Sequence, residues 1–163
     1  MELREGDPVM HWTYGLGKVI RLEERILSGQ KALYYAIKIG DLTVWVPADD
    51  NIGKRLRRPT PQAAFKKLHA ILTSPGEPLP EDRQERKIKL VELLKDGRAE
   101  SLCRVIRDLS AQQHVKTLNE NDHALMKRAQ SALLGEWGFV HSITPAQAEV
   151  ELHRLLSPSA PGD

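Results

Sequence analysis

Apolar and polar residues alternate along the first third of the chain with the period of a β-strand. The alternation is clearest over residues 35–39 and again over residues 42–46. Gly40 and Asp41 lie between these two runs, and a Gly-X pair in that position is typical of a two-residue hairpin turn. Further β-rich segments precede them, with a turn expected at residues 28–30 and a break at residues 15–17. Residues 6–47 are therefore predicted to form a small β-barrel or sheet of consecutive hairpins that ends at Pro47, because proline cannot donate to a strand ladder.

From Thr60 onward the apolar residues recur with the 3.6-residue period of an α-helix. Thr60 and Pro61 have the composition of a helix start, and Thr144 with Gln147 forms a capping-box pattern with Pro145 at the first helical position. A fraying end or a kink is expected where glycines fall at residues 135–138. The predicted helices span residues 60–72, 81–96, 99–112, from 119 onward, and 144–156.

These two patterns predict an α+β protein with a β-barrel domain followed by an all-α helical bundle. The boundary is expected in the junction at residues 48–59, where asparagine, glycine and proline interrupt both periodicities. The predicted domains are residues 1–58 and 59–157, and residues 158–163 are expected to be a disordered tail.

The basic residues are concentrated just after the predicted barrel. The chain of 163 residues carries a formal net charge of +2, but residues 54–89 alone carry +6, and the flanking segments are each −2. A local basic block is typical of a surface that binds a polyanion, of which DNA is the usual one. A solvated helix face is an equally good interpretation at so modest a net charge.

The residue types that carry catalysis are scattered. The six histidines show no i, i+4 pair around a glutamate, and Cys103, the single cysteine, falls within an apolar helical stripe. No nucleophile–base pair is apparent, so we expect neither an enzyme nor a cofactor. There is no long apolar run for a membrane span and no secretory signal, and one cysteine is typical of a reducing compartment, so a cytoplasmic location is expected.

Motifs across the whole chain resemble the CarD/CdnL family of transcription regulators, whose polymerase-interacting domain is related to one in the transcription-repair coupling factor. The first half carries Gly6-Asp7-x-Val9, Tyr14-Gly15-x-Gly17-x-Val19 and Gly40-Asp41-Leu42-Thr43-Val44-x-Val46-Pro47. The second half carries Gly97, Val105-x-Arg107-Asp108-Leu109, Leu118, Met126-x-x-Ala129 and Leu133-Leu134-x-Glu136. No single motif is specific to this family, but the occurrence of all of them in this order over two domains is specific.

The resemblance implies a Tudor-like (SH3-like) barrel that adds an edge strand to the RNA polymerase β subunit. The implied polymerase-binding residues are Thr43, Val44 and Trp45 on the contacting strand, with Arg25 on the earlier hairpin. Actinobacterial members have an arginine where Trp45 stands. Trp45 is therefore either an exposed interface anchor, as tryptophan often is, or a residue packed under the helical domain.

The resemblance also implies promoter DNA binding by the helical domain, but with a departure. The family inserts a tryptophan into the minor groove, within a W-x-R-R-Y-[KR] pattern, and alignment through Gly97 puts Arg83 in its place. Insertion of an aromatic side chain as a wedge between base pairs is thus not expected here. The basic residues Arg83, Arg86, Lys87 and Lys89 are still expected to bind phosphates or the minor groove. A monomer that binds polymerase and DNA is the preferred interpretation. The alternatives are a polymerase- or protein-binding adaptor that has lost DNA binding, and an enzyme with a polar pocket.

Overall fold

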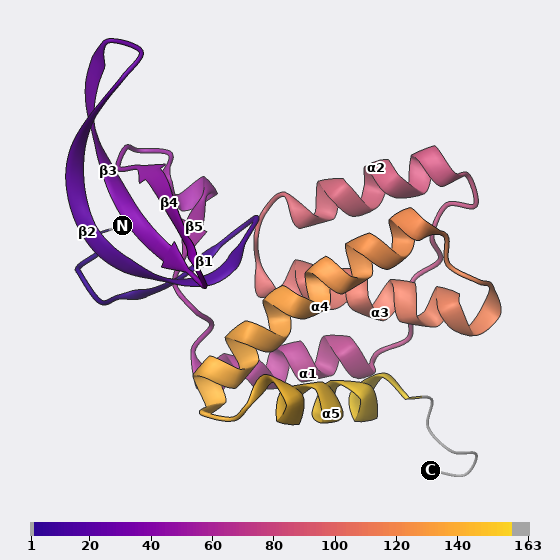
Figure 1. Ribbon diagram of the computed structural model, residues 1–163. Helices are drawn as coiled ribbons and strands as arrows, with labels where there is room; N and C mark the ends of the chain where they lie inside the picture. Colours follow the sequence, from indigo (N-terminus) through magenta and orange to yellow (C-terminus); the bar gives the residue numbers. More distant parts are fainter. Residues whose placement is uncertain (1, 158–163) are drawn as a thin grey trace. The chain divides into compact units, whose positions relative to one another are not determined.

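A computed structural model of the chain describes residues 2–157, which form two compact units that divide between Pro59 and Thr60. The first unit contains one antiparallel sheet of five strands in the order β4-β3-β2-β1-β5. Figure 1 shows these strands before the first helix. The strands are β1 (Pro8–His11), β2 (Gly15–Leu27), β3 (Gln30–Ile39), β4 (Leu42–Pro47) and β5 (Leu56–Arg57).

The sheet is open, so β4 and β5 are edge strands of a Tudor-like fold rather than neighbours in a closed barrel. The predicted two-residue hairpin joins β3 to β4, and Gly40 adopts a φ of 59°, which explains the glycine at that position. Gly15 begins β2 rather than forming the expected break; the turn lies at residues 12–14 instead. Pro47 is the last residue of β4, as expected.

One face of the sheet supplies the core of this unit. Its buried residues are Leu3, Val9, Val19, Tyr35, Ile37, Val46, Ile52 and Leu56. The last two come from the short helix η1 (Ile52–Lys54) and from β5, so the junction after β4 folds back onto the sheet. This packing holds the basic residues of the junction close to β1, because β5 is the direct antiparallel neighbour of β1 in the sheet.

The second unit is all-helical. It consists of η2 (Gln62–Ala64), α1 (Phe65–Thr73), α2 (Arg83–Leu94), α3 (Ala99–Val115), α4 (Glu120–His141) and α5 (Pro145–Leu156). The helices enclose one apolar cluster in which Cys103 is fully buried, as the sequence pattern predicts. The α+β class is therefore confirmed. No helix in the part of the chain that the structure describes is long and apolar enough to cross a membrane.

The strongest predicted helix start is present. The Thr144 hydroxyl accepts a hydrogen bond from the Gln147 backbone N–H at 3.1 Å, and the Gln147 side chain accepts one from the Thr144 N–H at 2.9 Å. Asn119 and Asp122 form a second capping box at the start of α4. Helix α4 then runs without interruption through Gly138 to His141, so it does not fray at residues 135–138.

The prediction for Thr60 is wrong. The chain enters α1 through the 3₁₀ turn η2, and no side chain caps either element. The Thr60 backbone N–H instead donates to the Glu136 carboxylate of α4 at 2.7 Å. A long-range partner has replaced the local cap, and it fixes the start of the helical unit. The predicted tail, residues 158–163, lies outside the described residues.

Candidate binding surfaces

Strand β4 presents unpaired backbone groups at the edge of the sheet. The Ala48 backbone N–H donates a hydrogen bond to the Leu33 carbonyl at 3.0 Å. Ala48 and Leu33 are therefore a hydrogen-bonded pair, and Val46 and Tyr35, two residues further along the same register, are the next one. Because hydrogen-bonded and non-hydrogen-bonded pairs alternate in an antiparallel ladder, the N–H and C=O groups of Thr43 and Trp45 point away from β3. Two of the residues expected to bind polymerase thus carry the outward backbone donors.

The Trp45 side chain lies on the sheet face opposite the core. The guanidinium carbon of Arg25 lies 4.2 Å from the centre of the Trp45 ring, and the Trp45 indole N–H donates to the Glu23 carboxylate. Arg21 donates to the other Glu23 oxygen at 2.8 Å. These contacts, Arg21 first and Trp45 second, hold the pKa of Glu23 below its usual value, so the carboxylate stays charged.

This Arg25–Trp45 surface is exposed enough to meet a partner. The Trp45 residue remains 37% exposed, and the Arg25 side chain is exposed to the same degree. The structure thus brings together Arg25 and Trp45, which the sequence places 20 positions apart. Val44 points to the other face and is half-buried, so its side chain serves the sheet core. Sequence reasoning missed Glu23, because its place in this cluster depends on the register that sets it opposite Tyr34 across β2 and β3.

Arg86 requires a correction. It is 6% exposed, and its Nε donates to the Asp122 carboxylate of α4 at 3.0 Å. Its Nη1 also donates to the carbonyl oxygens of Pro80 and Glu81, each at 3.1 Å. A buried guanidinium with these partners ties the loop before α2 to the start of α4, and it is not available to a DNA phosphate.

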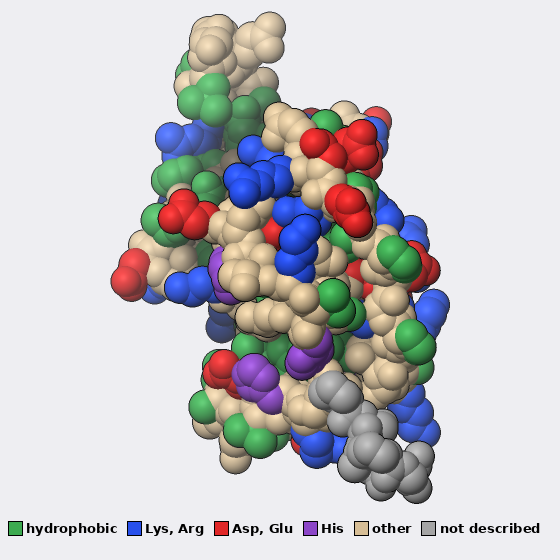
Figure 2. All heavy atoms as spheres, turned by 90° about the vertical axis from the view of Figure 1, so that its right-hand side faces the viewer, with side chains coloured by type: hydrophobic (Ala, Val, Ile, Leu, Met, Phe, Trp, Pro, Cys, Tyr) green, Lys and Arg blue, Asp and Glu red, His purple; other side chains and the backbone are tan. Residues whose placement is uncertain are grey.

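The other basic residues of α2 are exposed but do not share one face. Arg83 and Lys87 are four residues apart and lie on the same side of the helix. Lys89 follows Lys87 by two residues, which at 3.6 residues per turn moves it about 200° around the axis. On the face drawn in Figure 2, Lys and Arg side chains are interspersed with Asp and Glu rather than gathered into a continuous patch. Arg83 and Lys87 therefore remain as a pair, without Lys89.

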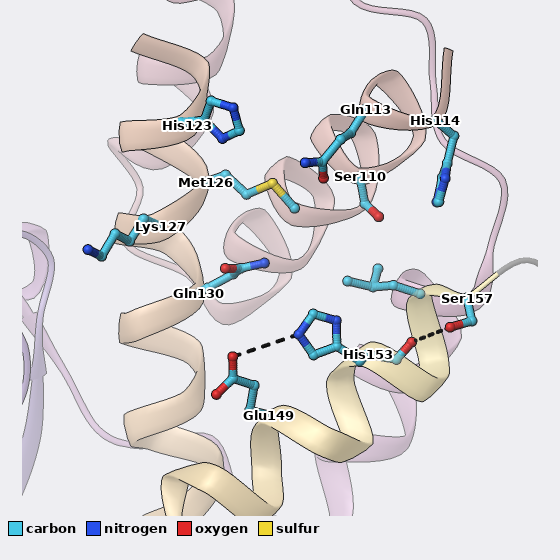
Figure 3. A pocket seen from close by; sticks show the side chains of 11 residues that line it. Ser110, Gln113, His114, His123, Met126, Lys127, Gln130, Glu149, His153 and Ser157 are labelled. Atoms are coloured by element: carbon cyan, nitrogen blue, oxygen red, sulfur yellow. Dashed lines mark hydrogen bonds and ion pairs between the residues drawn. The ribbon is translucent and has the colours of Figure 1, made fainter. Parts of the chain in front are cut away.

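A hollow of about 510 Å³ lies among α3, α4 and α5 (Figure 3). Each of the three helices contributes one histidine: His114, His123 and His153. His153 Nε2 lies 3.7 Å from the Glu149 carboxylate, but both side chains are more than half exposed, so water screens this pair. Within residues 2–157, no group of His, Cys, Asp and Glu is arranged to hold a metal ion.

Comparison with known protein families covers both units. Residues 3–59 match the CarD-like/TRCF RID domain, and residues 67–153 match the C-terminal domain of CarD. A similar protein in Bacillus subtilis (strain 168), described as "Putative transcription factor YdeB", is 26% identical over 145 residues, which covers 87% of this chain and 94% of that protein. An open Tudor-like sheet, a five-helix unit and two family domains in the same order give one conclusion: the chain belongs to the CarD-like family of transcription regulators.

Proposed function

We propose that this protein regulates transcription initiation by adding its β4 edge to a strand of the RNA polymerase β subunit. The observation that carries the proposal is the pair of outward backbone groups at Thr43 and Trp45, next to the exposed Arg25–Trp45 stack. Main-chain hydrogen bonds at a sheet edge supply affinity in strand addition, and neighbouring side chains supply specificity.

Trp45 is the proposed anchor of this interface. Stacking with Arg25 and hydrogen bonding to Glu23 hold the indole in one orientation before binding. A preorganised aromatic loses little side-chain entropy on association, and tryptophan is enriched among residues that dominate binding energy. Arg21 and Arg25 both pair with the Glu23 carboxylate, at 2.8 and 3.5 Å, so the cluster has one positive charge in excess, which favours a partner strand that carries an acidic side chain.

DNA binding is the second part of the proposal, and it involves fewer basic residues of α2 than the sequence pattern suggests. Arg83 and Lys87 form an exposed i, i+4 pair near the start of α2. Two cations on one helix face suit backbone phosphates rather than base edges. The exposed acids Glu81, Asp82 and Glu85 lie close in sequence, and they oppose tight binding.

An adaptor that binds polymerase without DNA is the second candidate. It is favoured by the burial of Arg86 and by the position of Lys89 away from Lys87. A mobility-shift titration of the full chain with promoter duplex, at low and at moderate salt, separates the two functions. Binding that falls steeply with salt supports the DNA-binding function, and no shift at either salt supports the adaptor.

Polymerase binding is tested by a proline on the β4 edge. Thr43→Pro removes an outward N–H that β3 does not use, and proline is tolerated on edge strands for that reason. Thr43→Ala is the matched control, because it keeps the backbone donor. We expect Thr43→Pro, with an unchanged circular dichroism spectrum, to lose co-purification with the polymerase β subunit while Thr43→Ala retains it. Equal retention by both variants contradicts strand addition at β4.

A further inference from the structure

Two lysines lie directly opposite each other on the outer face of the sheet, the face away from its core. The register of β2 with β3 pairs Lys18 with Lys38. Their neighbours along the chain, Val19 and Ile37, are buried in the core, so both lysine side chains point to the outer face. Like charges directly across an antiparallel pair are destabilising. The sheet therefore carries an unfavourable charge interaction at this place.

The protein itself does not relieve this repulsion. Both lysines are exposed, and within residues 2–157 neither ammonium group forms an ion pair. Lys18 and Lys38 line a hollow of about 540 Å³ together with Glu5, but the Glu5 carboxylate is not within ion-pair distance of either. Two positive charges are therefore open to a partner from outside the chain.

A β-bulge brings a further cation to the outer face. Ile20 is the extra residue in β2, because the register pairs Val19 and Arg21 with successive residues of β3. In a regular strand, residues three apart point to opposite faces. The bulge instead places Lys18 and Arg21 on the same face. The nearby acid Glu23 is hydrogen-bonded to Arg21 at 2.8 Å, so it serves that arginine rather than the lysines.

Lys38 connects the lysine pair to the free edge of the sheet. It lies opposite Thr43 of β4, so Lys18, Lys38 and Thr43 form one row across three strands. Neighbouring strands are about 4.8 Å apart, so a strand added beside β4 places a side chain on this face about 10 Å from the Lys38 backbone. A lysine and an acidic side chain together reach across the small Thr43. Repulsion from Lys18 favours a Lys38 ammonium directed toward that edge.

We propose that Lys38, supported by Lys18, selects an acidic side chain on the polymerase strand that pairs with β4, at the position beside Thr43. The inference rests on the proposed function, since it specifies the charge of the strand that the β4 edge accepts. An acid at this position relieves the repulsion between the lysines, so the pair that costs stability in the free protein becomes favourable in the complex.

The edge itself favours a peptide over a nucleic acid as the source of the negative charge. Thr43 directs both a backbone N–H and a C=O group outward, and a strand satisfies both. A DNA phosphate accepts from the N–H but leaves the carbonyl without a donor. The lysine row is also separate from the Arg25–Trp45 surface, because Trp45 lies opposite Ala36 in the next row of the sheet.

The test measures binding of the full chain to purified polymerase β subunit by calorimetry. Lys38→Glu is expected to weaken binding about tenfold at low salt, because repulsion replaces attraction, and the difference should shrink at high salt. Lys31→Glu is the matched control. Lys31 is on the same strand but on the other face, where it pairs with the exposed Glu24 at 3.2 Å. It makes the same change in net charge and is expected to bind as the wild type does.

Thermal stability separates recognition of a partner from a structural role. Lys38→Glu creates an opposite-charge pair with Lys18, so it is expected to raise the Tm while it lowers the affinity. Lys18→Glu should also raise the Tm, and it should weaken binding because it draws the Lys38 ammonium away from the edge. A lower Tm together with weaker binding for Lys38→Glu would make Lys38 structural and overturn the proposal.

Thr43→Pro distinguishes failure of this inference from failure of strand addition. If Thr43→Pro loses binding to the β subunit while Lys38→Glu binds as the wild type does, strand addition at β4 stands and the acidic partner residue is excluded. If Thr43→Pro binds as well as the wild type, both proposals fail. If Lys38→Glu lowers binding to a promoter duplex but not to the β subunit, the lysine pair belongs to a DNA site and the inference is overturned.

Discussion

The Arg86 guanidinium donates to the Asp122 carboxylate at 3.0 Å inside the helical unit, where the two side chains are 8% and 3% exposed. The other Asp122 oxygen accepts the Asn119 backbone N–H in the capping box of α4. One carboxylate therefore closes the start of α4 and anchors α2. This pair supports the architecture from which Arg83 and Lys87 project.

Arg86→Ala is expected to destabilise the protein by about 3–5 kcal/mol, because it leaves a buried carboxylate and two carbonyl oxygens without their donor. Arg86→Lys keeps the charge but cannot reproduce the Nε and Nη1 fork, so it should recover only part of this loss. Urea unfolding followed by circular dichroism measures both. Arg83→Ala, on the exposed surface, is the control and should change stability by no more than about 0.5 kcal/mol. A cost below about 1 kcal/mol for Arg86→Ala contradicts the anchoring role.

Trp45→Glu is expected to weaken polymerase binding by about 2 kcal/mol or more, the usual cost at a dominant interface residue. The change removes the ring that stacks on Arg25 and adds a second carboxylate beside Glu23. Calorimetry with the purified β subunit measures the effect. Ile88→Glu, at an exposed position of α2, is the matched control. If Trp45→Glu unfolds the sheet, the indole is structural and the interface assignment is wrong.

The stability of the helical unit should depend on pH through His69. Burial lowers the pKa of His69 below 6.5, and the neighbouring His141 and Arg154 act in the same direction, whereas Glu151 opposes them. The unfolded chain therefore binds a proton more readily than the folded one, and stability falls as pH drops through the unfolded value near 6.5. The Nε2 atoms of His69 and His141 are also buried without a hydrogen-bond partner.

His69→Leu should flatten this acid dependence. The variant removes both the titrating group and one unsatisfied nitrogen, so its advantage over the wild type should grow between neutral pH and about pH 5. Thermal melts over that range measure it, with His114→Gln as the exposed control. Parallel pH profiles for the wild type and His69→Leu would exclude His69 as the source.

Local signals account for the parts of this structure that sequence alone could predict. The turn at Gly40 and the cap at Thr144 each depend on residues within a few positions, so the local residue types were enough to predict them. The role of Arg86 depends on Asp122, 36 residues away, and a helical pattern shows only that both are polar. The Trp45 cluster likewise needs the register of three strands. The residues with long-range partners were therefore the ones that the pattern misjudged or missed.

DNA binding through α2 is expected to depend on Arg83 and Lys87 and not on Lys89. The double variant Arg83→Glu/Lys87→Glu should weaken binding to a promoter duplex and reduce the log–log salt slope by about 0.9 for each phosphate that is no longer neutralised. Lys89→Glu reverses the charge at one position on another side of the helix and serves as the control. A similar reduction for Lys89→Glu would mean that net charge alone, without a defined face, drives binding.

Restoring an aromatic at the family's wedge position tests whether α2 is directed at melted DNA. Arg83 is exposed and directly follows Asp82, which caps the helix by accepting the Glu85 N–H at 3.0 Å, so Arg83→Trp should not disturb the fold. An inserted ring opposes closure of the DNA bubble because it takes the place of base stacking at the opened step. We therefore expect Arg83→Trp to lengthen the open-complex lifetime of polymerase on a promoter template, with Lys89→Trp as the control. An unchanged lifetime with intact polymerase binding would favour the adaptor, because the helical unit would then not reach the edge of the bubble.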